Sequence, residues 1–150
     1  MLRRALFAVT AAYLLLVAWI TLNPFPADPH RNTLLEGLLA SFAATPLLAW
    51  IDYDVVETTA NVLLFVPFGV LFAILLGRWR WWLAFALGVA TTLTIEFVQL
   101  FLPTRFSDPR DLIANALGTL LGIGVVAVVT AARDRRGRER GAVAAASQRA

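Results

Sequence analysis

The chain contains no cysteine and no lysine, and it has a single histidine among its 150 residues. Without cysteine it can form neither disulfides nor the common structural zinc sites, and thiol catalysis is excluded. One histidine also rules out a multi-histidine metal site or a histidine relay within one chain. Charged residues are scarce, at 15%, whereas 59% of the residues are hydrophobic and the mean hydropathy is +0.73. This composition is typical of a small polytopic membrane protein.

Sequence motifs for common enzymatic chemistry are lacking as well. The glycines of the last apolar stretch lie inside a helical pattern with no strand before them, so they do not form a nucleotide-binding loop. The sequence offers no serine–histidine pairing for acyl transfer and no HExxH motif. We therefore expect no cofactor and no metal ion. We also expect no nucleic-acid partner, because membrane lipid is the nearer partner for the basic C-terminal tail.

Four stretches are long and apolar enough to cross a bilayer, which requires about 20 mostly apolar residues. They cover residues 5–22, 58–77, 82–102 and 110–132. The first follows two arginines, as a signal peptide would. However, it is long and lacks a small-residue cleavage site, so we expect a retained span. The sequence therefore predicts an all-α fold, a polytopic membrane bundle of four transmembrane helices.

The distribution of arginine predicts the orientation of these spans. If the N-terminus is inside, ten arginines lie at the inner side and three lie outside, as the positive-inside rule requires. Both termini are therefore expected in the cytoplasm, and the polar residues after the third span are expected outside. The inner arginines are Arg3, Arg4, Arg78, Arg80, Arg133, Arg135, Arg136, Arg138, Arg140 and Arg149, and the outer ones are Arg31, Arg105 and Arg110.

The segment between the first two spans is too long for a tight turn. Two prolines end the first span, and Thr33 and Glu36 then have the spacing of a capping box. The apolar run that follows, residues 34–44, is too short to span a membrane and predicts an interfacial or re-entrant helix. We divide the chain into a four-helix membrane domain, residues 1–132, and a basic tail, residues 133–150, which we expect to be disordered and cytoplasmic.

Polar residues of three spans are predicted to meet near their outer ends. Glu96 lies inside the third span, where a carboxylate facing lipid would be unfavourable and one facing the bundle could be paired. Residues three or four apart share a helix face, so Glu96 lies on one stripe with Gln99. Arg105 follows this span and could fold back as a cation suited to carboxylate or phosphate. The candidate ligand-binding residues are Glu96, Arg105, Gln99, Asn61, Asp111, Asn115 and Asp108, and no catalytic residue is assigned.

Several of these residues also have a purely structural interpretation. Asp108 followed by Pro109 fits an N-cap and the first position of a helix. Asp111 would then lie in the first turn, where a carboxylate favours the helix dipole. Asn61 and Asn115 could be hydrogen-bonding contacts between helices, a common role of amides in membrane bundles.

Three blocks of sequence resemble the signature of the VanZ-like family. They are residues 61–69 (NVLLFVPFG), 95–100 (IEFVQL) and 105–118 (RFSDPRDLIANALG). The resemblance covers roughly residues 10–130 and leaves out the arginine-rich tail. It implies a small integral membrane protein of the bacterial cell membrane. The namesake of the family is associated with low-level resistance to the glycopeptide teicoplanin.

Three functional hypotheses stay open. In the first, an outer-face pocket engages a lipid-linked envelope precursor or a lipoglycopeptide among membrane lipids, with Glu96 and Arg105 holding its polar head. In the second, the protein is a membrane hydrolase or transferase that acts on an envelope lipid. Glu96 or Asp111 would then be the acid or base and Arg105 the phosphate stabiliser, although no clear nucleophile is present. In the third, it is a structural assembly subunit or homo-oligomer that makes contact through Gly118 and Gly122, which have small-xxx-small spacing.

Overall fold

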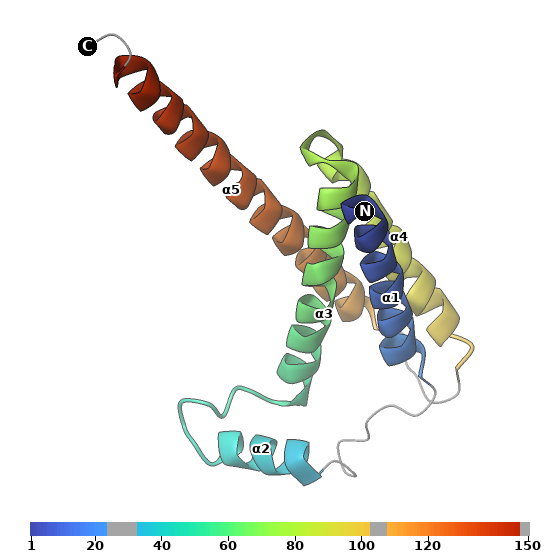
Figure 1. The fold of residues 1–150 in the computed structure, drawn as a ribbon. Coiled ribbons are helices and arrows are strands. Elements are labelled where there is room, and N and C mark those ends of the chain that lie inside the picture. The colour runs from blue at the N-terminus through green and yellow to red at the C-terminus, as the bar shows by residue number, and fades with distance from the viewer. Residues whose placement is uncertain (24–32, 103–107, 148–150) are drawn as a thin grey trace.

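The chain is all-helical over the residues that the structure describes. A computed structural model describes residues 1–23, 33–102 and 108–147, and within these ranges it contains helices and no strand (Figure 1). The elements are α1 (Leu2–Leu22), α2 (Thr33–Ala43), α3 (Tyr53–Leu76), the short 3₁₀-helix η1 (Arg78–Arg80), α4 (Trp81–Gln99) and α5 (Pro109–Ser147).

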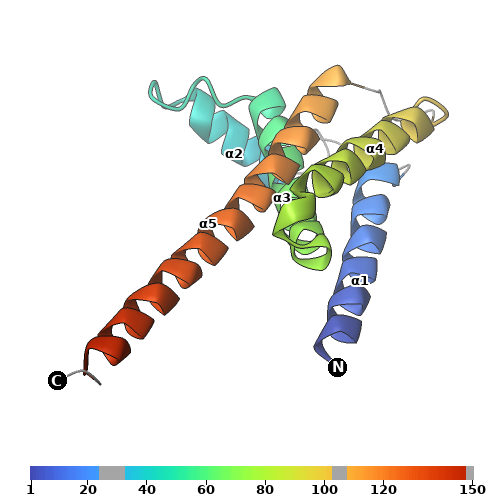
Figure 2. The same ribbon diagram turned by 90° about the horizontal axis from the view of Figure 1, so that it is seen from above.

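Four of these helices are long and apolar enough to cross a membrane, which confirms the predicted helical membrane bundle. They alternate in direction, so that α1 and α4 end where α3 and α5 begin (Figures 1 and 2). The polar ends of α3 and α5 therefore lie at one end of the bundle. The N-terminus and the α3–α4 turn lie at the other end.

The boundaries of the spans differ from the predicted ones by a few residues. Helix α3 begins five residues earlier than expected, at Tyr53, because Asp52 caps it: the carboxylate Oδ1 accepts a hydrogen bond from the Val55 backbone N–H, at 3.0 Å. Asp52 is thus the N-cap, and Asp54 lies in the first turn, where a carboxylate favours the helix dipole. Helix α4 ends at Gln99, three residues early, because the chain turns from Leu100 onward.

Helices α3 and α5 form the closest contact in the bundle, backbone against backbone. A Cβ added at Gly69 would collide with the carbonyl oxygen of Thr119, and one at Gly118 or Gly122 would collide with the carbonyls of α3. A Cβ on Gly122 would also lie 2.9 Å from the Gly69 Cα atom. Small residues permit this approach, which maximises dispersion contact where lipid supplies no hydrophobic driving force. Gly118 and Gly122 thus make a packing contact within the chain, with α3 as the partner.

The core beside this crossing is aromatic. Phe65 and Phe68 are fully buried and pack with Val17 of α1 and Ile95 of α4. The Phe65 and Phe68 rings stack with centroids 5.6 Å apart. This cluster joins α1 and α4 to the α3–α5 pair.

Helix α2 lies apart from the four long helices, across the end where α3 begins (Figure 1). It starts at Thr33, as the capping-box spacing predicts. Leucines and one phenylalanine gather on one face, and Leu34 and Leu38 of that face are 76% and 51% exposed. Glu36 lies on the opposite face. An exposed amphipathic helix of 11 residues fits the predicted interfacial location, which stays a prediction.

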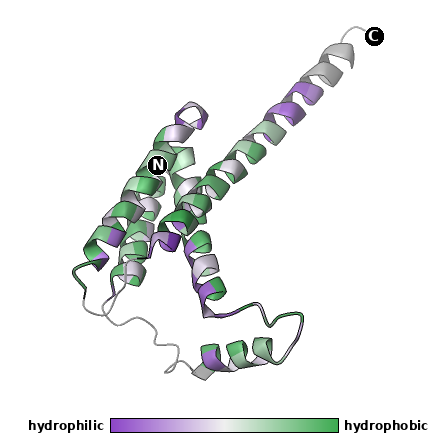
Figure 3. Cartoon of the chain, turned by 180° about the vertical axis from the view of Figure 1, so that it is seen from behind, coloured by the Kyte–Doolittle hydropathy of each residue, from purple (hydrophilic) through white to green (hydrophobic). Residues whose placement is uncertain are grey.

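The basic tail differs from our expectation of disorder. Helix α5 continues for 39 residues to Ser147 and projects beyond the other helices, and its distal part carries the hydrophilic residues (Figures 1 and 3). Alanine, arginine and glutamate are strong helix formers, and a helix that is already formed propagates without a new nucleation step. At 1.5 Å per residue α5 is ~58 Å long, against a bilayer core of about 30 Å, so roughly half of it lies outside the membrane core.

We predict that Gly122→Ala destabilises the protein by about 1–3 kcal/mol, since the three nearest atoms that its Cβ would meet are backbone atoms, which cannot easily move aside. The matched control is Gly124→Ala on the same helix, where an added Cβ meets nothing within 4 Å. The free energy of unfolding is measured in mixed micelles with increasing SDS. Equal stability of the two variants would contradict the close crossing.

Candidate functional site

The N-terminal part of α3 and the first turn of α5 are joined by two polar pairs. The Asn61 Nδ2 atom donates a hydrogen bond to Asp111 Oδ1 at 2.7 Å, in a half-buried position. Nearer the helix ends, the Arg110 guanidinium lies 3.0 Å from the Asp54 carboxylate, and both side chains are about two-thirds exposed. An exposed ion pair of this kind contributes little, whereas the Asn61–Asp111 bond is partly shielded from water. The expected interhelical role of Asn61 is thus present in the structure.

Asp108 caps α5. Its Oδ1 atom accepts a hydrogen bond from the Arg110 backbone N–H at 2.8 Å, with Pro109 as the first helical residue. This is the structural role that the Asp-Pro pair predicts, and it places Asp111 in the first helical turn beside its positive dipole. The carboxylates of Asp108 and Asp111 are therefore both engaged in fixing the start of α5.

A second polar layer lies deeper, along one face of α4. Thr92, Glu96 and Gln99 are all buried, with exposed fractions of 0%, 9% and 6%. The prediction that Glu96 faces the bundle rather than lipid is confirmed by this burial. These residues are three or four positions apart, so they form a continuous stripe ~10 Å long.

Each amide in this layer bonds to a different helix. The Asn115 Nδ2 atom of α5 donates to the Thr92 hydroxyl at 2.8 Å, and Asn115 is 3% exposed. The Gln99 Nε2 atom donates to the Thr21 backbone carbonyl of α1 at 2.9 Å. The Thr119 hydroxyl in turn donates to the Asn115 carbonyl at 2.9 Å. These bonds connect α1, α4 and α5 around the stripe that carries Glu96.

Two acceptors in the same layer lack a hydrogen bond. The side-chain oxygens Oε1 of Gln99 and Oδ1 of Asn115 are buried and have no hydrogen-bond partner among the residues that the structure describes. A buried acceptor without a donor costs roughly 1–3 kcal/mol, so such atoms in a membrane interior are usually satisfied by water or a ligand. Glu96 lies on α4 between Gln99 and the Thr92 position that Asn115 contacts. The layer thus combines a buried carboxyl group with two oxygens that require donors.

The observed pairings differ in part from the predicted constellation. Asn61 and Asp111 bond to each other, and Asn115 and Gln99 use their N–H groups on threonines. The polar residues therefore form an outer pair and a deeper layer. Arg105 lies outside the described residues, so its pairing with Glu96 stays a prediction.

The three threonines of the polar layer differ in how far the sequence identifies them. The spacing of Thr92 from Glu96 already places it on the same helical stripe. Thr119 follows Asn115 by one helical turn. Thr21 contributes only its backbone carbonyl, which no residue pattern could reveal. Within the described ranges, no group of three or more His, Asp or Glu side chains is placed to hold a metal ion.

We predict from these contacts that Asn61 and Asp111 are energetically coupled. A double-mutant cycle of Asn61→Ala and Asp111→Ala should give a coupling free energy of about 0.6–2 kcal/mol, the range for interhelical hydrogen bonds in membranes. The exposed Asp54–Arg110 pair is the control and should give less than about 0.5 kcal/mol. Both cycles use the free energy of unfolding in mixed micelles, and the reverse ranking would show that the shielded bond is not formed.

Comparison with known proteins relates this chain to a protein family. A family model described as VanZ/LLP1 matches residues 10–130. Protein VanZ of Enterococcus faecium is 28% identical over 113 residues, which cover 75% of this chain and 68% of that protein. The matched range contains the outer pair, the deeper polar layer and all three sequence blocks that resemble the family signature. No solved structure matches the chain.

Proposed function

Because the chain belongs to the VanZ/LLP1 family, we propose that it acts in the bacterial cell envelope by engaging a lipid-linked or amphipathic molecule at its outer polar layer. The chain is a VanZ-type membrane protein with four apolar helices. The family resemblance links it to teicoplanin resistance, and the proposal adds a ligand class and a location for the contact.

The proposed orientation places both termini in the cytoplasm. Support comes from the alternation of the four helices, which brings Arg3 and Arg4 to the same end of the bundle as Arg78 and Arg80 (Figure 1). The arginines of α5 beyond residue 132 extend from the membrane core on that side as well. Arginine-rich ends stay on the cytoplasmic side of bacterial membranes. The Asn61–Asp111 pair and the Glu96 layer then belong to the outer half of the bilayer.

The observation that carries the proposal is the pair of buried oxygens on Gln99 and Asn115 that have no donor in the described part of the chain. A ligand that supplies hydroxyl, amide or ammonium hydrogens would satisfy them and lower the free energy of the bound state. Sugar and peptide head groups of envelope precursors and lipoglycopeptides carry such donors. An attached acyl chain would remain in the surrounding lipid, which makes an amphipathic ligand a good match.

The other candidate residues have distinct proposed roles. Glu96 would form a hydrogen bond with the same head group. Arg105, which follows the third span, would bind a phosphate or carboxylate group of the ligand. Asn61, Asp111 and Asp108 would fix the entrance by holding α3 and α5 together. Their hydrogen bonds to one another and to the backbone support this positioning role.

The two rival functions have less support. A hydrolase or transferase would need an activated nucleophile, and the hydroxyl groups of Thr92 and Thr119 in the polar layer are engaged in hydrogen bonds. An assembly role through Gly118 and Gly122 is weakened because both glycines already contact the α3 backbone of their own chain. A homo-oligomer would therefore need another surface.

We predict that Glu96→Gln lowers the affinity for the ligand about tenfold, equivalent to about 1.4 kcal/mol, because it keeps the shape and removes the acid. Native mass spectrometry of gently extracted protein measures the retained ligand, and the teicoplanin susceptibility of a host expressing each variant gives the cellular readout. Arg105→Ala should act in the same direction.

The control for this experiment is Thr94→Val on the exposed face of α4, where the hydroxyl bonds only to its own helix. That variant should retain both ligand and phenotype. If stable Glu96→Gln and Arg105→Ala proteins both match the wild type, the outer polar layer is not the binding site.

A further inference from the structure

A pocket lies at the opposite end of the bundle from the polar layer, between the end of α3, η1 and the middle of α5. Its volume is about 340 Å³, within the ~300–1,000 Å³ range of small-molecule sites. Ala73 and Ile123 form its buried apolar part, and Val126 extends it along α5. Arg78 and Trp81 complete its lining on the side of the α3–α4 turn.

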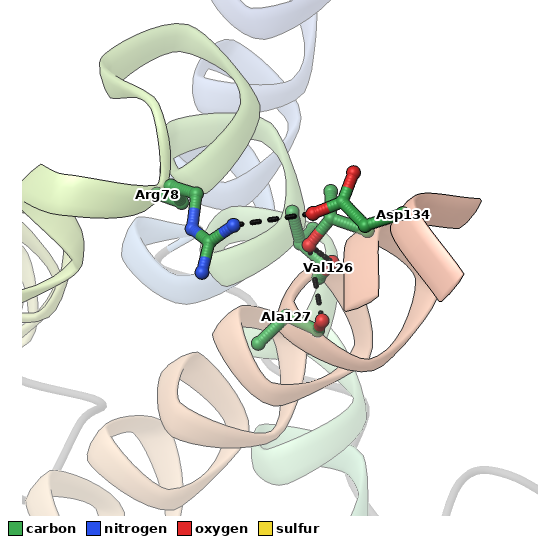
Figure 4. A network of polar contacts seen from close by, with 5 residues as sticks. Arg78, Val126, Ala127 and Asp134 are labelled. Carbon is green, nitrogen blue, oxygen red and sulfur yellow. Dashed lines mark hydrogen bonds and ion pairs between the residues drawn. The ribbon is translucent and has the colours of Figure 1, made fainter. Parts of the chain in front are cut away.

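The turn that presents Arg78 has a fixed geometry. Gly77 ends α3 with φ of 79°, a conformation that side chains rarely adopt, and its N–H donates to the Ala73 carbonyl at 3.0 Å. The chain then reverses through η1 and directs Arg78 toward α5 (Figure 4). The backbone of this turn therefore holds the Arg78 guanidinium at the edge of the pocket.

The edge of the pocket is charged and its interior is apolar. The Arg78 guanidinium lies 3.2 Å from the Asp134 carboxylate of α5 (Figure 4). Both side chains remain more than half exposed, at 60% and 54%, so the pair is weakly held. Thr130 also lines the pocket, and its hydroxyl donates to the carbonyls of Val126 and Ala127 on the same helix. A ligand here would meet a cation at its head and hydrocarbon along its body.

The surroundings of the pocket match the boundary between the bilayer core and the head groups. Trp79, Trp81 and Trp82 are 84%, 52% and 57% exposed beside Arg78, and exposed tryptophans concentrate at this boundary. The local charge is strongly positive, since residues 77–82 and 130–136 together contain five arginines and one acidic residue, Asp134. These arginines are Arg78, Arg80, Arg133, Arg135 and Arg136.

We propose that this pocket is a binding site for an anionic phospholipid of the cytoplasmic leaflet. The lipid phosphate binds the Arg78 guanidinium, which offers paired N–H donors to phosphate oxygens, and displaces Asp134. An acyl chain occupies the apolar part between Ala73, Ile123 and Val126. Basic pockets between transmembrane helices on the cytoplasmic side are suited to such head groups. The site is independent of the outer polar layer, because it lies at the other end of the bundle and shares no residue with it.

The test uses the full chain in detergent, titrated with phosphatidylglycerol or phosphatidylcholine and observed by native mass spectrometry. Wild-type protein should retain phosphatidylglycerol in preference to phosphatidylcholine. Arg78→Gln should weaken phosphatidylglycerol binding about tenfold, the loss of one charge-assisted contact. Arg80→Gln is the matched control, since it removes the same charge from the same turn but does not line the pocket. Equal losses for the two variants, or equal retention of the two lipids, would overturn the site.

A second pair of variants keeps the proposal testable if Arg78→Gln does not fold. Asp134→Asn removes the competing carboxylate and should strengthen phosphatidylglycerol binding. Ala127→Phe fills the pocket without changing the charge and should weaken it. Inorganic phosphate and glycerophosphoglycerol, which lack acyl chains, should not displace the lipid at equal concentration. Displacement by either compound, or unchanged binding in both variants, would overturn a lipid site.

Discussion

The contact between the α3 and α5 backbones at Gly69, Gly118 and Gly122 determines the positions of both polar regions of this protein. In a membrane, helices are not driven together by the exclusion of water, so close packing and hydrogen bonds must supply the association free energy. Three glycines allow the helix axes to approach until backbone atoms meet. Every side chain on the two facing stripes is then placed relative to this crossing.

The stripe on α5 shows how this placement works. Asp111 and Asn115 precede Gly118 on one helix face, and Ile123 follows Gly122 directly. On α3, Asn61 precedes Gly69 by two helical turns and Ala73 follows it by one. The Asn61–Asp111 bond on one side of the crossing and the apolar part of the pocket on the other therefore follow from the same fit. A change in the crossing would disturb both ends of the molecule together.

Hydropathy and the pattern of polar residues predict much of this fold from the sequence. Four spans, the short helix at Thr33 and the burial of Glu96 follow from the length of apolar runs, a capping pattern and the desolvation of a carboxylate. The pairings of Asn115 with Thr92 and of Gln99 with Thr21 could not be predicted. They depend on the rotation of each helix about its axis and on which helices become neighbours. The contact of Gly69 with the Thr119 carbonyl also depends on the neighbouring helix, although Gly69 lies on the face of α3 that Phe65 and Ala73 define.

The same reasoning explains why the helical tail differs from the expected disorder. Composition alone suggests a mobile basic segment, since the tail lacks the apolar residues needed to form a core. Attached to a membrane-spanning helix, however, it needs only propagation, and alanine and arginine favour that step. The continuous helix places Asp134 one to two turns beyond Ala127 and Thr130, at the height of the Arg78 side chain. The tail therefore shapes the inner pocket, because its first turn brings the carboxylate that competes for Arg78.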